Sequence, residues 1–216
     1  MSIAAFFDMD RTLIRVNSGH LWVGYLRERG EITLRESLRA VAWLAQYKLS
    51  VLDMESVSAR VVAAMAGDSE QELADKSRRF FAERIAHHIS DEGRRAVERH
   101  RAAGHHIALL TSSTRYVAEP LAEALQIDHI LCTTLGVREG LFDGTLQPPA
   151  CYGHGKVERA QRFCEDMGLA LEPSFFYTDS YSDLPMLERV SGARVVNPDA
   201  RLARFAARVG WEVLSW

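Results

Sequence analysis

The hydrophobic and polar positions along the chain change their spacing as the sequence proceeds. A continuous apolar run over residues 3–7, bounded by polar residues, indicates a buried strand. From about residue 15 to residue 88 the apolar residues recur at helical spacing. From residue 90 onward, short apolar runs alternate with helical patterns. The sequence therefore predicts an α/β protein in which a helical block separates the first strand from the second.

The block of residues 15–88 is expected to be an inserted helical bundle that forms a cap domain. Its helices are predicted to begin at residue 18, at a capping box over residues 33–36, near residue 54 and after residue 68. Their apolar stripes indicate packing between helices. Residues 1–14 and 89–216 are then expected to form the core domain.

The second part of the chain predicts a doubly wound, mostly parallel sheet with a Rossmann-like arrangement. Further strands are expected over residues 105–111, 128–133, 174–178, 193–196 and 211–214, and residues 135–146 carry a hairpin signature. Helices of ordinary length separate these strands, so both faces of the sheet should be covered. Active sites of such sheets lie beyond the carboxyl ends of the strands.

Two carboxylates, Asp8 and Asp10, directly follow the first strand. Alternate side chains of an extended segment leave the same face, so these two acids can converge on one point. Like charges raise each other's pKa, and the pair therefore suits a divalent cation or one protonated acid. Both arrangements fit phosphoryl transfer with Mg²⁺ held by oxygen ligands. The alternative is a helix cap or a turn.

Polar residues also follow two other predicted strands. Thr111 and Ser112 supply hydroxyl and N–H groups at a helix start, which suits an anion or a plain N-cap. Asp179 and Asp183 follow the strand at 174–178 and are either site residues or helix caps. All these strand ends would face one crevice if the sheet is parallel.

Lys156 lies in the first turn of a predicted helix, where the helix dipole disfavours a cation. This position suits a lysine that reaches a phosphate or a carboxylate, and the alternative is a solvated surface residue. The preceding glycines are similar to the end of a P-loop, but Ala150 and Val157 stand where that motif needs Gly and Ser or Thr. An ATP-binding P-loop is therefore not expected.

Together these segments resemble the motifs of the haloacid dehalogenase superfamily of phosphotransferases. Residues 8–12 match its first motif, Asp-x-Asp-x-Thr, Thr111 matches the second, and Lys156 matches the third. Residues 179–187 are similar to the fourth motif. The helical insertion resembles the cap of the phosphoserine-phosphatase-like branch, subfamily IB.

The resemblance implies a role for each matching residue. Asp8 would be the nucleophile that forms an aspartyl-phosphate, and Asp10 would protonate the leaving oxygen and then activate water. Mg²⁺ would be held by Asp8, by Asp10 through its backbone carbonyl, and by Asp179, with Asp183 supporting the metal directly, through water or through Lys156. The phosphoryl group would be bound by residues of the first three motifs: Thr12, Thr111, Ser112 and Lys156.

Asn17 departs from the pattern of this branch. Phosphoserine phosphatases that resemble the chain carry a Glu at this position, which binds the substrate amine. Asn17, with Ser18 and His20, could contact a different polar leaving group. The resemblance implies a small phosphorylated metabolite, such as histidinol phosphate, phosphoserine or a related amino-alcohol phosphate, because a large cap would seal the site.

Composition limits the partners and the compartment. The net charge of −3 gives no basic footprint for nucleic acid. The three cysteines, Cys132, Cys151 and Cys164, form neither a disulfide framework nor a zinc set, which favours a reducing cytoplasm. No signal peptide and no membrane-spanning segment is expected.

Two alternatives to a phosphatase remain open at this point. Asp-x-Asp also binds the cation of metal-dependent glycosyltransferases, although that class gives no reason for Asp179, Asp183 or Lys156. A non-catalytic phospho-acceptor of the same fold is the other alternative, and the presence of Asp10 argues against it.

Overall fold

The computed structural model describes residues 3–48 and 61–216, with the side chains of residues 43–48 left out of the description. The strands are β1 (Ala4–Phe7), β2 (His106–Thr114), β3 (His129–Arg138), β4 (Leu141–Gln147), β5 (Phe175–Thr178), β6 (Gly192–Val196) and β7 (Glu212–Leu214). The helix expected near residue 54 falls mostly on residues 49–60, outside the described part.

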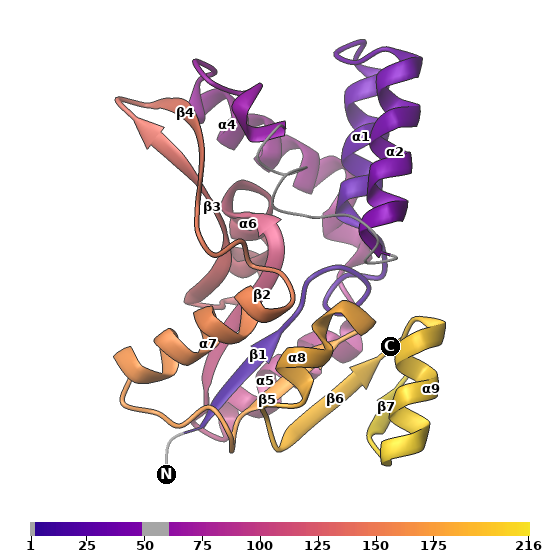
Figure 1. Cartoon of the computed structure of the whole chain (residues 1–216), viewed down its shortest axis with the longest axis vertical. Helices are drawn as coiled ribbons and strands as arrows, with labels where there is room; N and C mark the ends of the chain where they lie inside the picture. Colours follow the sequence, from indigo (N-terminus) through magenta and orange to yellow (C-terminus); the bar gives the residue numbers. More distant parts are fainter. Residues whose placement is uncertain (1–2, 49–60) are drawn as a thin grey trace.

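Helices occupy the intervals between these strands, except between β3 and β4 (Figure 1). Between β1 and β2 lie α1 (Ser18–Glu28), α2 (Leu34–Lys48), α4 (Glu70–Phe80), a π-helical turn (Phe81–Ile85), a 3-10 turn (Ala86–His88) and α5 (Asp91–Ala102). Later come α6 (Arg115–Leu125), α7 (His154–Asp166), a 3-10 turn (Tyr181–Asp183), α8 (Leu184–Leu187) and α9 (Ala200–Val209).

The strands form one sheet in the order β4-β3-β2-β1-β5-β6-β7. All neighbouring pairs are parallel except β3 and β4, which form the expected antiparallel hairpin. Its turn has positive φ at Glu139 (53°) and Gly140 (77°), as a two-residue hairpin turn requires. The predicted doubly wound, mostly parallel α/β fold is confirmed.

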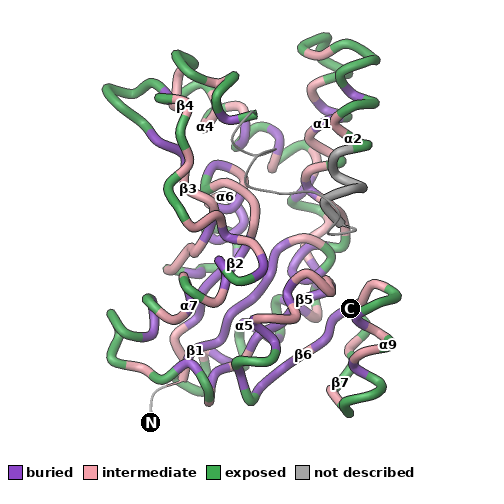
Figure 2. Tube along the Cα trace, viewed as in Figure 1, coloured by how far each residue is buried: buried purple, intermediate pink, exposed green. Residues whose placement is uncertain are grey.

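Apolar side chains leave both faces of β1 and enter two separate cores. Phe7 packs with α5 and α6 on one face, whereas Phe6 packs with α7, α8 and α9 on the other. Each phenylalanine is fully buried, which stabilises the fold by roughly 2–3 kcal/mol per ring. Figure 2 shows β1 buried along its whole length, as the central strand of a sheet covered on both faces must be.

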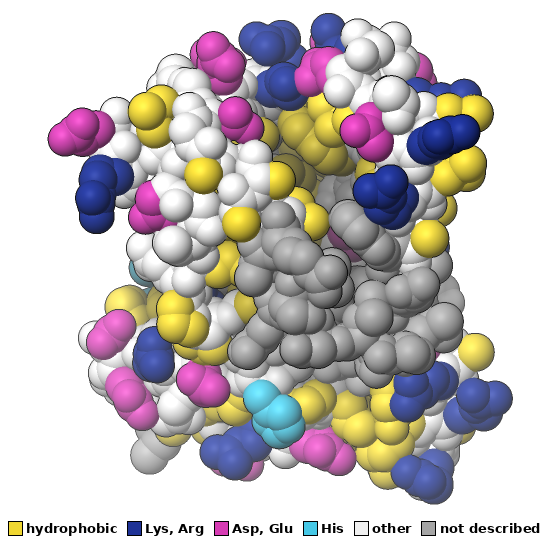
Figure 3. All heavy atoms as spheres, turned by 45° about the horizontal axis from the view of Figure 1, so that its top comes forward, with side chains coloured by type: hydrophobic (Ala, Val, Ile, Leu, Met, Phe, Trp, Pro, Cys, Tyr) yellow, Lys and Arg dark blue, Asp and Glu magenta, His cyan; other side chains and the backbone are white. Residues whose placement is uncertain are grey.

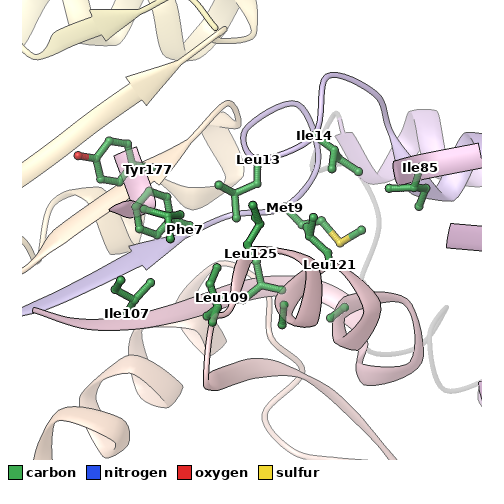
Figure 4. Close-up of a cluster of buried hydrophobic side chains, with 14 of the residues drawn as sticks. Phe7, Met9, Leu13, Ile14, Ile85, Ile107, Leu109, Leu121, Leu125 and Tyr177 are labelled. Carbon is green, nitrogen blue, oxygen red and sulfur yellow. The ribbon is translucent and has the colours of Figure 1, made fainter. Parts of the chain in front are cut away.

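The first core continues from the sheet into the helical insertion. Tyr25 of α1, Phe80 of α4 and Ile85 of the π-helical turn belong to the same buried cluster as Phe7 (Figure 4 draws Phe7 and Ile85). Viewed from the top, two lobes rise above the sheet, α1 with α2 and α4 with the hairpin, and apolar side chains line the recess between them (Figure 3). The division into a core domain and a cap domain at residues 14/15 and 88/89 stays a prediction.

Two strands run further than the sequence pattern indicated. β2 continues through Thr114, where its register with β3 shifts, and β3 continues through Arg138 because its second half pairs with β4. Among the helices of the described residues, none combines the length and the hydropathy needed to cross a bilayer.

Candidate active site

The polar strand ends meet at the middle of the sheet, because β1 lies between β2 and β5 and runs parallel to both. Asp8 follows β1, Asp179 follows β5, and Thr111 lies in the last part of β2. Each of these three side chains is at least 93% buried, since none is more than 7% exposed. Their burial at adjoining strand ends is the arrangement expected of a site outside the carboxyl edge.

Lys156 joins the first strand to the segment after the fifth. Its Nζ donates hydrogen bonds to Oδ1 of Asp8 at 2.9 Å and to Oδ2 of Asp183 at 2.7 Å. Lys156 is 2% exposed, so the alternative of a solvated surface lysine is wrong. A buried ammonium between two buried carboxylates has its charge compensated at short range.

Two glycines place Lys156 at this point. Gly153 precedes α7 with φ +50°, a backbone conformation that side chains disfavour. A Cβ on Gly155 would lie 1.9 Å from the carbonyl oxygen of Ala150, so only glycine allows α7 to begin this close to the preceding loop. Gly153 and Gly155 therefore serve to start a helix whose lysine is directed inward.

Asp183 is held by a second buried group. The hydroxyl of Thr178 donates to Oδ2 of Asp183 at 2.6 Å, and the N–H of Ser180 donates to the same hydroxyl oxygen at 3.2 Å. Oδ2 of Asp199 accepts from the N–H of Tyr181 at 2.8 Å, which anchors the 3-10 turn that carries Asp183. The carboxylate position is thus fixed by the end of β5 and by the following turn together.

Asp10 contacts the beginning of the helical insertion. Its Oδ1 accepts from the N–H of Ser18 at 2.9 Å, and its Oδ2 accepts from Nδ2 of Asn17 at 3.2 Å. Asn17 is also the N-cap of α1, because its Oδ1 accepts from the N–H of His20 at 2.9 Å. Asn17 therefore links Asp10 to the first helix of the insertion.

Apolar residues anchor the loop that carries the two acids. Met9 lies between Asp8 and Asp10 and is fully buried, as are Leu13 and Ile14 (Figure 4). The carbonyl oxygen of Met9 accepts from the N–H groups of Leu13 and Ile14 at 3.0 and 3.1 Å. Met9, Leu13 and Ile14 thus anchor the loop in the core.

Burial and neighbouring charges shift the titration of the central groups. Burial raises the pKa of Asp8 to about 7, against the opposing attraction of Lys156. Burial also raises the pKa of Asp10, against the hydrogen bond from Ser18. Burial alone would lower the pKa of Lys156, but the carboxylates of Asp183 and Asp8 outweigh it and hold that pKa above its ordinary value. Lys156 is consequently a permanent cation at neutral pH.

The hydroxyl-bearing residues predicted to bind phosphate occupy different environments. Thr111 is buried, and its Oγ1 accepts from the N–H of Ser113 at 3.2 Å. Ser112 is partly buried and its carbonyl accepts from the hydroxyl of Thr133 at 2.9 Å. The hydroxyl of Thr12 is buried with no hydrogen-bond partner within the described structure. Phosphate binding by these three residues stays a prediction.

The donor set fits Mg²⁺ by charge and by ligand type. Asp8, Asp179 and Asp183 offer hard carboxylate oxygens and Asp10 offers its backbone carbonyl, and these acids outnumber Lys156, the cation that contacts Asp8 and Asp183. Residues 3–48 and 61–216 contain no group of three or more His, Cys, Asp or Glu side chains already gathered as for a metal. Lys156 instead bridges two of the carboxylates.

Sequence reasoning missed Thr178 as a partner of Asp183 and did not assign Asn17 to Asp10. The sequence pattern marks Thr178 only as the last residue of a strand. Its position directly before the acidic turn is the signal that points to it as a partner of Asp183. The link from Asn17 to Asp10 needs the loop of residues 11–16 to fold back. The backbone N–H of Arg11 closes that loop by donating to the carbonyl of Val16 at 3.1 Å.

Comparison with known proteins identifies relatives along the whole chain. Residues 5–188 match the family of haloacid dehalogenase-like hydrolases. A histidinol-phosphatase from Neisseria meningitidis is 32% identical over 221 aligned positions that cover 100% of both chains. A phosphoserine phosphatase from Mycobacterium tuberculosis is 31% identical, and the alignment covers 99% of this chain and 70% of that protein.

Solved structures share the same architecture. A protein of unknown function from Bordetella pertussis superposes with a TM-score of 0.89 at 30% identity, with 99% of each chain covered. A substrate-bound phosphoserine phosphatase gives a TM-score of 0.70 at 14% identity, covering 100% of this chain and 93% of that one, a likeness of fold alone. With a family match that spans all four motif segments and full-length relatives at this identity, the chain belongs to the haloacid dehalogenase-like hydrolase family.

Proposed function

We propose that the protein is a Mg²⁺-dependent phosphatase that hydrolyses a small phosphomonoester through an aspartyl-phosphate on Asp8. The observation that carries the proposal is the buried bridge from Asp8 through Lys156 to Asp183, which unites three motif segments in one polar site. Family membership supports hydrolysis and argues against the glycosyltransferase alternative.

In the first step a carboxylate oxygen of Asp8 attacks phosphorus in line, and the bond from phosphorus to the leaving oxygen breaks. Asp10 gives its proton to that oxygen, so an alcohol departs. The raised pKa of Asp10, caused by burial, favours a proton on this group at the start of the cycle. An Asp-phosphate mixed anhydride then remains on the enzyme.

In the second step the carboxylate of Asp10 takes a proton from water, and the water oxygen attacks phosphorus. The bond between phosphorus and Asp8 breaks, which releases inorganic phosphate and restores both carboxyl groups. Throughout, Lys156 and Thr111 would bind the phosphoryl oxygens, because donors placed there stabilise the charge of the transition state. Asp8, Asp179 and the Asp10 carbonyl, with Asp183 in support, would hold Mg²⁺, which would neutralise further negative charge of the phosphoryl group.

The names of the relatives support a substrate class, and Asn17 marks where this chain differs from phosphoserine phosphatases. The relatives are named for histidinol phosphate and phosphoserine, and both are phosphate esters of amino alcohols. We infer the same class here. Asn17 is neutral and already bonded to Asp10, so it does not offer the substrate amine a carboxylate. The residues of the insertion, including α1, would form the cap that limits access to small esters.

A phosphate-release assay with Mg²⁺ tests the proposal. The panel should hold histidinol phosphate, phosphoserine and phosphoethanolamine, with glycerol phosphate as the matched ester without an amine. We expect turnover of at least one amino-alcohol phosphate that exceeds turnover of glycerol phosphate, and loss of activity with a chelator. If Asp8→Asn still hydrolysed p-nitrophenyl phosphate, the assignment of Asp8 as the nucleophile would be refuted. A covalent phosphate stable for many minutes would instead favour the phospho-acceptor.

A further inference from the structure

A cavity lies beside the loop that carries Asp8 and Asp10. Its volume is about 600 Å³, and its walls include Arg11, Arg15, His20 and Trp216. Asp8, Lys156 and Asp183 do not line it. Asn17 lines this cavity and also donates a hydrogen bond to Asp10, so the cavity wall is connected to the candidate active site.

The charges around the cavity have one sign. Among the described residues that line it there are two arginines, Arg11 and Arg15, but no Asp or Glu. Arg15 makes one ion pair, a 3.3 Å contact with the exposed Glu92, and Arg11 has no ion-pair partner within the described part of the chain. Cations gathered around a concave surface without acids attract anions from solution.

The backbone of Arg11 supplies an independent observation. Arg11 has φ +56°, in the left-handed region that strongly favours glycine. Its carbonyl accepts from Nδ2 of Asn197 at 3.2 Å, and Asn197 also bonds the N–H of Trp216 through Oδ1 at 3.0 Å. The side chain of Asn197 thus holds the backbone of Arg11 and the backbone of Trp216 together. Backbone strain that a structure maintains in this way concentrates at functional sites.

We propose that this cavity binds a small organic anion whose carboxylate or phosphate group pairs with Arg11 and Arg15. The planar guanidinium groups suit both anions, because each can form two parallel hydrogen bonds with them. The apolar part of the ligand lies against Trp216, Val16 and Leu21, which complete the wall. Binding of this anion does not require Asp8 to become phosphorylated.

Titration followed by NMR of the indole N–H of Trp216 tests the site without any turnover. The resonance is assigned with Trp216→Phe, and the metal-free full chain is titrated with benzoate, phenylphosphonate and neutral benzyl alcohol. We expect a saturable shift with at least one anion and none with the alcohol, weakening as salt rises. The anion that binds with the higher affinity shows whether the site prefers a carboxylate or a phosphate-like group. No saturable shift with either anion overturns the proposal.

Arg11→Gly separates binding from stability. Because glycine relieves the strained φ, we expect a melting temperature equal to or above that of the wild type, with anion affinity about tenfold weaker. Glu139→Gly is the matched backbone control, since Glu139 also has positive φ but lies in the hairpin turn. Arg162→Gln, an exposed arginine on α7, is the charge control. Both controls should bind as the wild type does.

Arg15→Gln provides a second variant should Arg11→Gly fail to fold, and we expect it to weaken binding in the same direction. Unchanged affinity in both arginine variants overturns the assignment. Since no step of this test measures phosphate release, its failure would leave the phosphatase proposal untouched, and a failed phosphatase assay would leave the cavity untouched.

Discussion

Nζ of Lys156 and Oδ1 of Asp8 lie 2.9 Å apart although 148 residues separate them in the chain. Together with the 2.7 Å contact to Asp183, this pair gives the site its structure before any ligand arrives. The two carboxylates would repel each other without the ammonium group between them. The stability of the fold and the chemistry of the site therefore depend on the same lysine.

Lys156→Met should destabilise the protein by about 3–5 kcal/mol, because it leaves two buried carboxylates uncompensated. Urea unfolding at pH 7.5 without Mg²⁺ measures this loss. The deficit should shrink as pH falls, since protonation of one carboxyl relieves the repulsion. Arg162→Gln, on the exposed face of the same helix, should change stability by less than about 0.5 kcal/mol. A Lys156→Met variant as stable as the wild type would contradict the bridge.

Thr178→Val removes the hydroxyl that donates to Oδ2 of Asp183 at 2.6 Å. The loss of a buried hydrogen bond to a charged group should cost about 1.5–3 kcal/mol and lower turnover. Thr178→Ser keeps the hydroxyl and is the matched control. Equal unfolding midpoints for the valine and serine variants would show that this bond has no energetic role.

Asn17 has two functions that two substitutions can separate. Asn17→Ser keeps an N-cap for α1 but is too short to reach Asp10, so stability should stay near wild type while kcat falls about tenfold. Asn17→Ala loses both contacts and should also lose about 1 kcal/mol of stability. Thermal unfolding and steady-state kinetics on the same samples provide the two readouts. If serine restored kcat fully, the contact with Asp10 would be dispensable.

His100 predicts a pH dependence of stability. It is 7% exposed, its Nε2 lies 2.9 Å from the hydroxyl of Tyr177, and burial together with the charge of His105 lowers its pKa to about 4. As pH falls below about 6.5 the unfolded chain takes up this proton before the folded protein does, so stability is lost between pH 6.5 and 4. The loss from this group is on the order of 3 kcal/mol.

Comparison with His100→Phe isolates this contribution from that of the carboxylates. The difference in unfolding free energy between wild type and variant should change across pH 6.5 to 4 and be constant above pH 7. A difference that is flat over the whole range would show that His100 titrates alike in the folded and unfolded states.

Local patterns predicted most of the fold and the acidic centre of the site. The apolar run before Asp8, the glycines at the helix ends and the capping box at Thr33 each act within a few residues. The box is confirmed by the 2.7 Å bond from the N–H of Thr33 to Oε2 of Glu36. Parallel strands then necessarily bring Asp8 and Asp179 to one edge, so the convergence followed from topology.

Side-chain partners that depend on tertiary packing could not be predicted in this way. The burial of Lys156 results from the close approach of Gly155 to Ala150, and no spacing in the sequence encodes that contact. The left-handed backbone conformation of Arg11 could not be predicted either, because the residue at this position is not a glycine. The extension of β3 to Arg138 depends on its pairing with β4, and the hairpin signature alone does not predict how many residues pair.

Chemical trapping of the intermediate tests the central claim most directly. The protein is mixed with p-nitrophenyl phosphate and Mg²⁺, treated with sodium borohydride and digested for peptide mass spectrometry. We predict conversion of Asp8 to homoserine in the wild type and no conversion in Asp8→Asn. The homoserine should be more abundant in Asp10→Asn, because p-nitrophenolate leaves without a general acid but the attack of water on the intermediate lacks the general base Asp10. Turnover without modification of Asp8, or with the modification on another residue, would contradict the account.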